Sequence, residues 1–317
     1  MFWQSLSFSL SVTGPICILL FLGWFLKRIG VIHDAFVDNA SKLVFQITLP
    51  TLLFLGIVNS NQSVEINASF ILFGLIANIA FFLLTTFSCK FFIKDKQDHG
   101  VIIQGGFRAN TAIIGLAYVA NVYGDSGVAV AAVYVASTTI LYNILAVICL
   151  TSSESTIGIK KIKGVLISIS KNPLIIGIML GVLLLALNIK VPKILVDTGQ
   201  YFANMTLPLA LLCTGATLNL GELRNKGLNA WFASFFKLLL APILITGTAY
   251  LWGFSDIEIG LLFFMTAAPT AAASYVMARS MGGNANLAAN IIAITTAGSL
   301  ITCSLGISIL YSFNFFP

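Results

Sequence analysis

Hydrophobic runs alternate with short polar or charged breaks along the whole chain. A helix that crosses the hydrocarbon core of a bilayer needs about 20 mostly apolar residues, so each run predicts one transmembrane helix. The runs are Ser7–Leu26, Phe36–Val58, Ala68–Phe92, Gly100–Tyr123, Gly127–Leu150, Pro173–Ile189, Leu195–Leu218, Trp231–Trp252, Ile257–Met281 and Leu287–Tyr311. The pattern predicts an all-α integral membrane protein with ten transmembrane helices.

Lysine and arginine are concentrated in every second break between the runs. The even-numbered breaks hold only Lys190 and Lys193. The odd-numbered breaks hold Lys27, Arg28, Lys90, Lys94, Lys96, Lys160, Lys161, Lys163, Lys171, Arg224, Lys226 and Arg279. Because cytoplasmic loops are enriched in basic residues, we expect the odd loops to be cytoplasmic. The protein would then lie in the cell membrane with both termini on its outer side.

Short motifs recur at an offset of 158 residues, which predicts an internal repeat. The recurring pairs are Pro15 with Pro173, Gly23 with Gly181, Thr48-Leu49-Pro50 with Thr206-Leu207-Pro208, and Gly124 with Gly282. Five helices is an odd number, so the second copy enters the membrane from the opposite side. We therefore expect a five-plus-five inverted repeat, with one copy at residues 1–150, a cytoplasmic linker at 151–165 and the second copy at 166–317.

The composition excludes a soluble globular domain. Hydrophobic residues make up 58% of the chain and charged residues 9%, with a mean hydropathy of +0.98, whereas soluble domains carry about 25% charged residues. The net charge of +6 lies in the loops, where membrane orientation explains it. The expected partner is therefore the lipid bilayer, with no nucleic acid.

Two of the predicted helices carry residues that interrupt helical structure. The fourth contains Gly105, Gly106 and Gly115, and the ninth contains Pro269. Non-helical backbone at membrane depth survives only inside protein or beside a wet cavity. We expect broken helices four and nine to cross near the midplane, where the N-termini of half-helices suit an anion.

The charges inside the predicted helices are positive, because the carboxylates fall in loops or near helix ends. Arg108 either attracts an anion or caps carbonyls at the cytoplasmic end of helix four, and a structural role is favoured for Lys237. Lys42 is near enough to the cytoplasmic end to extend to water. Candidate substrate-binding residues are Arg108, Asn110, Thr111, Tyr142, Asn143, Pro269, Thr270, Ser274 and Asn290.

Several motifs together resemble the auxin efflux carrier family, which includes bacterial malonate and malate carriers and plant auxin exporters. They are the two Thr-Leu-Pro tripeptides, the segment Phe107–Gly115, the Asn-Pro-Leu-Ile-Ile-Gly that begins at Asn172, and Ala267–Ala278. The resemblance implies a fold similar to bile-acid sodium symporters, with helices one, two, six and seven as a scaffold. It also implies elevator-type alternating access, a homodimer formed through the scaffold, and substrate at the crossing of helices four and nine.

The resemblance also assigns individual residues. Asn110 is similar to the family's crossover asparagine, Pro269 to its crossover proline, and Asn143 to a polar residue of helix five near the substrate. Auxin exporters often have proline two residues beyond the glycine that matches Gly115, and this chain has Ala117 there. The long hydrophilic central loop of the plant members is also missing, so auxin is not inferred as the substrate.

We expect a secondary transporter of a small organic anion, a mono- or dicarboxylate. The alternatives are a sensor or receptor on a transporter-like scaffold, and a sodium-coupled symporter of another amphipathic anion. An enzyme is not expected, because His33 and His99 lie in loops and no carboxylate is deep in the membrane. No cofactor or metal site is predicted, and the coupling ion is left open between H⁺ and Na⁺.

Overall fold

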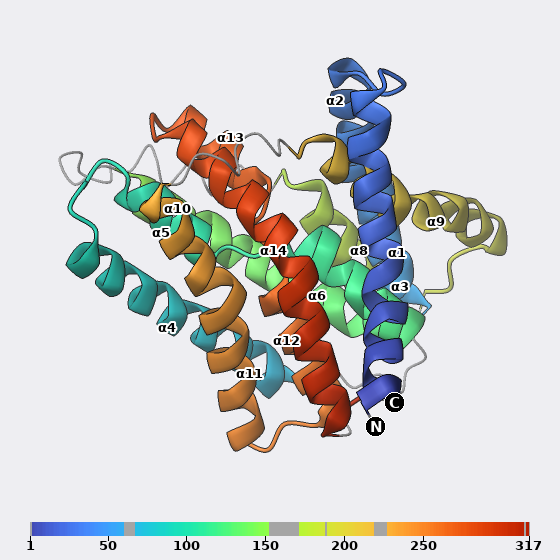
Figure 1. The fold of residues 1–317 in the computed structure, drawn as a ribbon. Helices are drawn as coiled ribbons and strands as arrows, with labels where there is room; N and C mark the ends of the chain where they lie inside the picture. The colour runs from blue at the N-terminus through green and yellow to red at the C-terminus, as the bar shows by residue number, and fades with distance from the viewer. Residues whose placement is uncertain are drawn as a thin grey trace.

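The computed structural model describes residues 2–59, 67–151, 171–187, 189–218, 227–313 and 315–316. Helices account for its regular structure in these ranges (Figure 1), apart from one isolated bridge between Ala109 and Thr270. The helices are α1 (Phe2–Arg28), α2 (Asp34–Leu43), η1 (Val44–Thr48), α3 (Leu49–Val58), α4 (Ala68–Phe92), α5 (His99–Phe107), η2 (Thr111–Gly115), α6 (Leu116–Leu150), α8 (Pro173–Ala186), α9 (Lys193–Ala216), α10 (Leu228–Phe235), η4 (Phe236–Leu240), α11 (Ala241–Leu251), α12 (Asp256–Ala267), α13 (Ala273–Ser280) and α14 (Ala285–Ser312). The segments η1 and η4 are π-helical turns inside longer helices, and η2 is a π-helical turn at the start of the helix that continues as α6.

Six helices within the described residues are long and apolar enough to cross a membrane. They are Leu6–Arg28, Asp34–Val58, Ala68–Phe92, Thr111–Leu150, Leu228–Leu251 and Ala285–Ser312. The chain is thus an all-helical, multi-pass membrane protein. The count of ten spans stays a prediction, because several of the other apolar runs form short helices such as α8 and α12.

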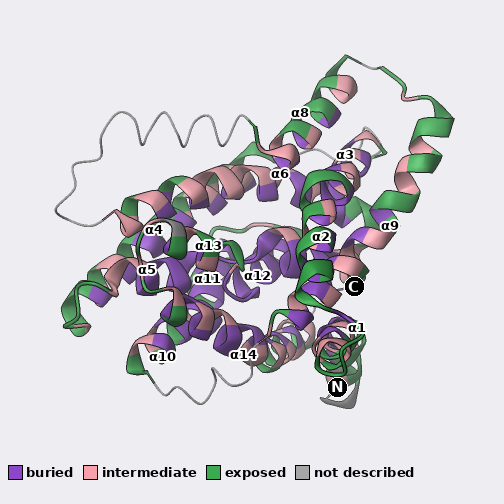
Figure 2. Cartoon of the chain, turned by 90° about the horizontal axis from the view of Figure 1, so that it is seen from above, coloured by how far each residue is buried: buried purple, intermediate pink, exposed green. Residues whose placement is uncertain are grey.

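The surface of the bundle is apolar and its interior holds polar groups, as expected for a protein surrounded by lipid. Outward faces of α1, α4, α8 and α9 are exposed, whereas α5 and α12 lie in the buried interior (Figure 2). Ile18, Phe87 and Ile194 are among the exposed apolar side chains, while Asn78 and Arg108 are buried. This distribution places the polar chemistry inside the bundle.

Close helix contacts involving glycine join α1 to α9 and α3 to α8. A side chain at Gly23 of α1 would overlap the backbone oxygen of Leu212 in α9, and one at Gly181 of α8 would crowd the backbone oxygen of Phe54 in α3. The two contacts are related by the offset of 158 residues, since Gly23 corresponds to Gly181 and Phe54 to Leu212. Small residues allow such close backbone approach between membrane helices.

Gly124 and Gly282, which are also 158 residues apart, both have positive φ angles, of 59° and 78°. Gly124 kinks α6 between the segments predicted as helices four and five. Gly282 follows the end of α13. The predicted linker at 151–165 lies outside the described residues except for Thr151, and the start of the second copy, 166–170, does too.

Candidate functional site

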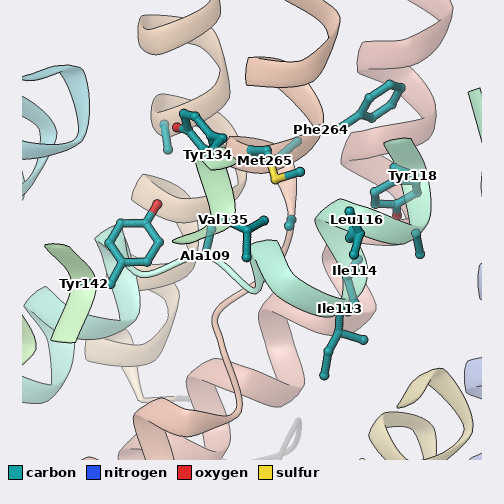
Figure 3. Packing of buried hydrophobic residues seen from close by; sticks show 14 of the residues in the cluster. Ala109, Ile113, Ile114, Leu116, Tyr118, Tyr134, Val135, Tyr142, Phe264 and Met265 are labelled. Atoms are coloured by element: carbon teal, nitrogen blue, oxygen red, sulfur yellow. The ribbon is translucent and has the colours of Figure 1, made fainter. Parts of the chain in front are cut away.

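Two helices are interrupted in the middle of the bundle. Helix α5 ends at Phe107, and helical structure resumes in η2 at Thr111. Helix α12 ends at Ala267, and α13 begins at Ala273. Figure 3 shows Ala109 on the first of these non-helical connections, between buried side chains of α6 and α12.

The two non-helical segments lie against each other and satisfy each other's backbone groups. The Asn110 N–H donates to the Pro269 oxygen at 2.7 Å, and the Ala271 N–H donates to the Arg108 oxygen at 3.1 Å. The two donors, at positions 110 and 271, are 161 residues apart in the sequence, and so are the two acceptors, at 108 and 269. This reciprocal pairing lets non-helical backbone persist in a setting where an unpaired amide is costly.

The interruption in the first of these helices does not fall on the predicted glycines. Gly105 and Gly106 lie inside α5, and Gly115 has helical torsions at the end of η2. These glycines serve close packing, because a Cβ at Gly105 would approach Ile291 to 2.8 Å and one at Gly106 would approach Thr85 to 2.8 Å. The non-helical residues are Arg108, Ala109 and Asn110, whereas Pro269 does lie within its interruption.

A cavity of about 620 Å³ adjoins the paired segments. It is lined by Phe45, Gln46, Arg108, Ala109, Asn110, Thr111, Ala112, Ile113, Thr139, Tyr142, Asn143, Lys171, Asn172, Pro173, Leu174, Ala271, Ala272 and Ala273. Three helix N-termini border it, at Thr111, Pro173 and Ala273. Each N-terminus presents partial positive charge and backbone N–H groups, which favour an anion.

Arg108 adds a full positive charge to this cavity. Its side chain is 6% exposed and donates to Asn143 Oδ1 at 2.8 Å and to Met277 Sδ at 2.7 Å. Arg108 has no carboxylate partner among the described residues, where the ion pair joins Lys27 to Asp34. A buried guanidinium without a carboxylate partner is costly, and an anion in the cavity would offset that cost.

Tyr142, which lines the cavity, is held by a buried network between α4 and α6. The Tyr142 hydroxyl donates to Asn78 Oδ1 at 2.7 Å, and Asn78 Nδ2 donates to the Tyr134 hydroxyl at 3.0 Å. Asn78 Nδ2 also donates to the Gly74 oxygen at 2.7 Å. Tyr134 and Tyr142 are both visible in Figure 3. The network fixes the side chain of Tyr142 in the wall of the cavity.

The structure separates the predicted site residues into two groups. Arg108, Asn110, Thr111, Tyr142 and Asn143 line the cavity together. Pro269, Thr270, Ser274 and Asn290 are not among its lining residues.

The second group belongs to the crossing itself or to the packing around it. The Pro269 oxygen accepts from Asn110, and Thr270 Oγ1 donates to the Gly105 oxygen at 2.7 Å. Ser274 and Asn290 are buried. The Pro269 oxygen and the Thr270 hydroxyl therefore hold the two interrupted helices together.

Residues from three other segments also line the cavity without having been predicted. They are Phe45 and Gln46 in η1, Lys171 and Asn172 before α8, and Ala271, Ala272 and Ala273 around the start of α13. Asn172 caps α8 by accepting from the Leu174 N–H at 3.0 Å, a role that its place before proline could have suggested. Lys171 carried no such signal, since it was counted only as a loop charge. Within the described residues no cluster of metal-binding side chains is present.

Comparison with known proteins identifies relatives over almost the whole chain. The sequence profile described as "Membrane transport protein" matches residues 11–307. An uncharacterized transporter of Methanocaldococcus jannaschii is 25% identical over 304 residues, covering 92% of this chain and 95% of the relative. The uncharacterized transporter YfdV of Escherichia coli (strain K12) is 23% identical over 308 residues, covering 95% and 98%.

Proposed function

The chain belongs to the membrane transport protein family, the auxin efflux carrier family that its motifs predicted, and we propose that it is a secondary active transporter of a small organic anion. The observation that carries the proposal is the cavity beside the interrupted helices. Its lining includes Arg108, Lys171 and three helix N-termini, and it includes no carboxylate among the described residues. This combination favours negative charge, so a mono- or dicarboxylate is the proposed substrate.

The proposed binding mode uses Arg108 as the main anion contact. A guanidinium has five N–H donors in a fork that fits a carboxylate, and Asn143 and Met277 orient it. Thr111 and the amides at the start of η2 and α13 supply further donors. Lys171, which is exposed at the rim, would attract the anion before it reaches Arg108.

An elevator-type mechanism in a ten-helix inverted repeat is part of the same proposal. Three observations support a repeat: the glycine contacts at an offset of 158, the positive φ angles of Gly124 and Gly282, and the reciprocal hydrogen bonds between the interruptions. In this scheme α1, α3, α8 and α9 form the scaffold through which a homodimer assembles. The paired interruptions travel with the moving domain and carry the anion.

The cavity is proposed to face the cytoplasm. Lys171 and Asn172 at its rim follow the basic loop that the charge pattern predicts to be cytoplasmic. The structure would then correspond to an inward-facing state in a cell membrane, with both termini outside.

A thermal-shift screen of the purified protein tests the anion assignment. Ligand binding raises the melting temperature by mass action, so C3–C4 mono- and dicarboxylates should stabilise the protein in a concentration-dependent manner. Amines and neutral solutes of the same size serve as controls. Stabilisation by amines or neutral solutes alone would contradict the proposed substrate class.

A further inference from the structure

Lys237 is a second buried cation, on the side of the crossing that does not line the cavity. Its side chain is 1% exposed, and its Nζ donates to the backbone oxygen of Thr266 at 2.7 Å. Thr266 lies in the last turn of α12, directly before the interruption that contains Pro269. The ammonium therefore contacts the carbonyl end of an interrupted helix.

The end of α12 needs a positive partner. The last carbonyls of a helix have no partner within the helix, and they carry the negative end of the helix dipole. Pro269 has no N–H to donate, and the Thr270 N–H donates to Thr295 Oγ1 instead. Cys303 Sγ donates to the Ala267 oxygen at 3.4 Å, and Lys237 supplies the charge.

Carbonyl oxygen, and not a carboxylate, is the acceptor that the structure gives Lys237. Helices α5, α10, α11, α12 and α14 pack around η4. Among their described residues, Cys303 of α14 is the ionisable group near the Lys237 ammonium. Asp256 and Glu258 lie in the first turn of α12, at the opposite end of that helix. Backbone carbonyl oxygen is one of the ligands that proteins offer to small hard cations, and here the Thr266 oxygen faces the ammonium.

The local backbone directs Lys237 toward this position. It lies in η4, a π-helical turn within the span Leu228–Leu251, and Pro242 follows shortly after. A π-turn adds a residue to the helix and changes the direction of the side chains around it, and such turns are frequent at functional sites. The buried ammonium and the interrupted helix are therefore brought together by two irregular segments.

We propose that Lys237 is a tethered cation whose ammonium fills the place of a small monovalent cation at the carbonyl end of α12. The interrupted helix is then compensated in charge without a bound inorganic ion. If the proposed transport function is correct, substrate uptake does not require Na⁺. The charge at this point also stays with the protein throughout the transport cycle.

Cation rescue of melting temperature tests the proposal without reference to any substrate. Lys237→Ala removes the ammonium and leaves room for a small cation, so its melting temperature should fall by several degrees. Ethylammonium should restore most of this loss, whereas ethanol and choline at equal concentration should not. Ser234→Ala is the matched control, because Ser234 is buried one turn away in α10 and its hydroxyl donates to the Ala230 oxygen of its own helix.

The proposal is overturned if Lys237→Ala melts like the wild type, or if ethylammonium, choline and ethanol act alike on it. Wild-type uptake in vesicles, compared in Na⁺ and in K⁺ at equal ionic strength, provides a test that needs no variant. Equal rates support the proposal, and a requirement for Na⁺ overturns it. Absence of anion uptake in both salts would contradict the proposed function, while the melting experiment would still decide the role of Lys237.

Discussion

Arg108 and Lys237 are both buried basic residues, yet their surroundings differ. Arg108 borders a cavity and has Asn143 Oδ1 and Met277 Sδ as acceptors. Lys237 faces a helix end and has a backbone oxygen. A guanidinium has five N–H donors, so Arg108 retains capacity for a ligand, whereas the contact made by Lys237 serves the fold of α12. The sequence favoured a structural role for Lys237 and left two roles open for Arg108.

Asn78 is the residue whose replacement should most weaken the cavity wall. In Asn78→Ala the hydroxyls of Tyr134 and Tyr142 lose their shared partner, and each buried unsatisfied polar group costs about 1–3 kcal/mol. We expect a clearly lower melting temperature than for the wild type. Thr248→Ala, at an exposed position, should change the free energy of unfolding by no more than about 0.5 kcal/mol. Equal melting of the two variants would contradict the role of the network.

The chemistry of the cavity could be predicted from the sequence because polar residues inside apolar runs are conspicuous. Arg108, Asn110, Thr111, Tyr142 and Asn143 were recognised in this way and line the cavity. Gln46 and Lys171 were not: Gln46 is a single polar residue in the middle of the run Phe36–Val58, and Lys171 lies in the basic break before Pro173–Ile189. Their contribution depends on how η1 and the start of α8 pack against α6, which local pattern does not specify.

At the scale of the element, helix α1 offers a matched test of close packing. A Cβ at Gly23 would overlap the Leu212 oxygen, whereas one at Gly14, in the same helix, has no atom within 4 Å. Gly23→Ala should therefore force α1 and α9 apart and lower the melting temperature. Gly14→Ala should leave it unchanged or slightly raised, because alanine favours helix by about 1 kcal/mol over glycine. Stability that is equal in both variants would contradict the tight α1–α9 contact.

Helix positions were predicted well where a run is uniform and apolar. The predicted Ala68–Phe92 and the observed α4 have the same bounds. The interruption after α5 was placed incorrectly, since Gly105 and Gly106 are helical and the chain opens at Arg108–Asn110. The Pro269 oxygen accepts from Asn110 and the Ala271 N–H donates to Arg108, so the position of that opening depends on a segment about 160 residues away in the sequence and not on local propensity.

At the scale of the whole molecule, the predicted topology can be tested by labelling single cysteines. In a background with Cys17, Cys89, Cys149, Cys213 and Cys303 replaced by alanine, a cysteine is introduced at exposed Lys96 or Lys190. We expect Lys190→Cys to react with a membrane-impermeant maleimide in intact cells. Lys96→Cys should react only after permeabilisation, because its loop is predicted to be cytoplasmic. The opposite pattern would reverse the orientation, and with it the side to which the cavity opens.

In the fold as a whole, the two halves of the chain pack against each other and its two ends meet. Glycine contacts bring α1 to α9 and α3 to α8, the paired interruptions lie in the buried interior, and Phe8 stacks on Tyr311 with ring centroids 4.6 Å apart, so the two ends of the chain are neighbours (Figure 1). The sequence offset predicted such a relation between the halves. The contacts that support it depend on individual small residues, which hydrophobic periodicity does not reveal.

Uptake of a radiolabelled C3–C4 carboxylate into proteoliposomes tests the central claim most directly. The wild type is compared with Arg108→Gln and with Arg279→Gln, whose side chain is exposed in the last turn of α13. Loss of a charge-assisted contact of about 1.5–3 kcal/mol should lower uptake at limiting substrate about tenfold or more in Arg108→Gln, while Arg279→Gln transports like the wild type. Wild-type uptake by a folded Arg108→Gln protein would contradict the account.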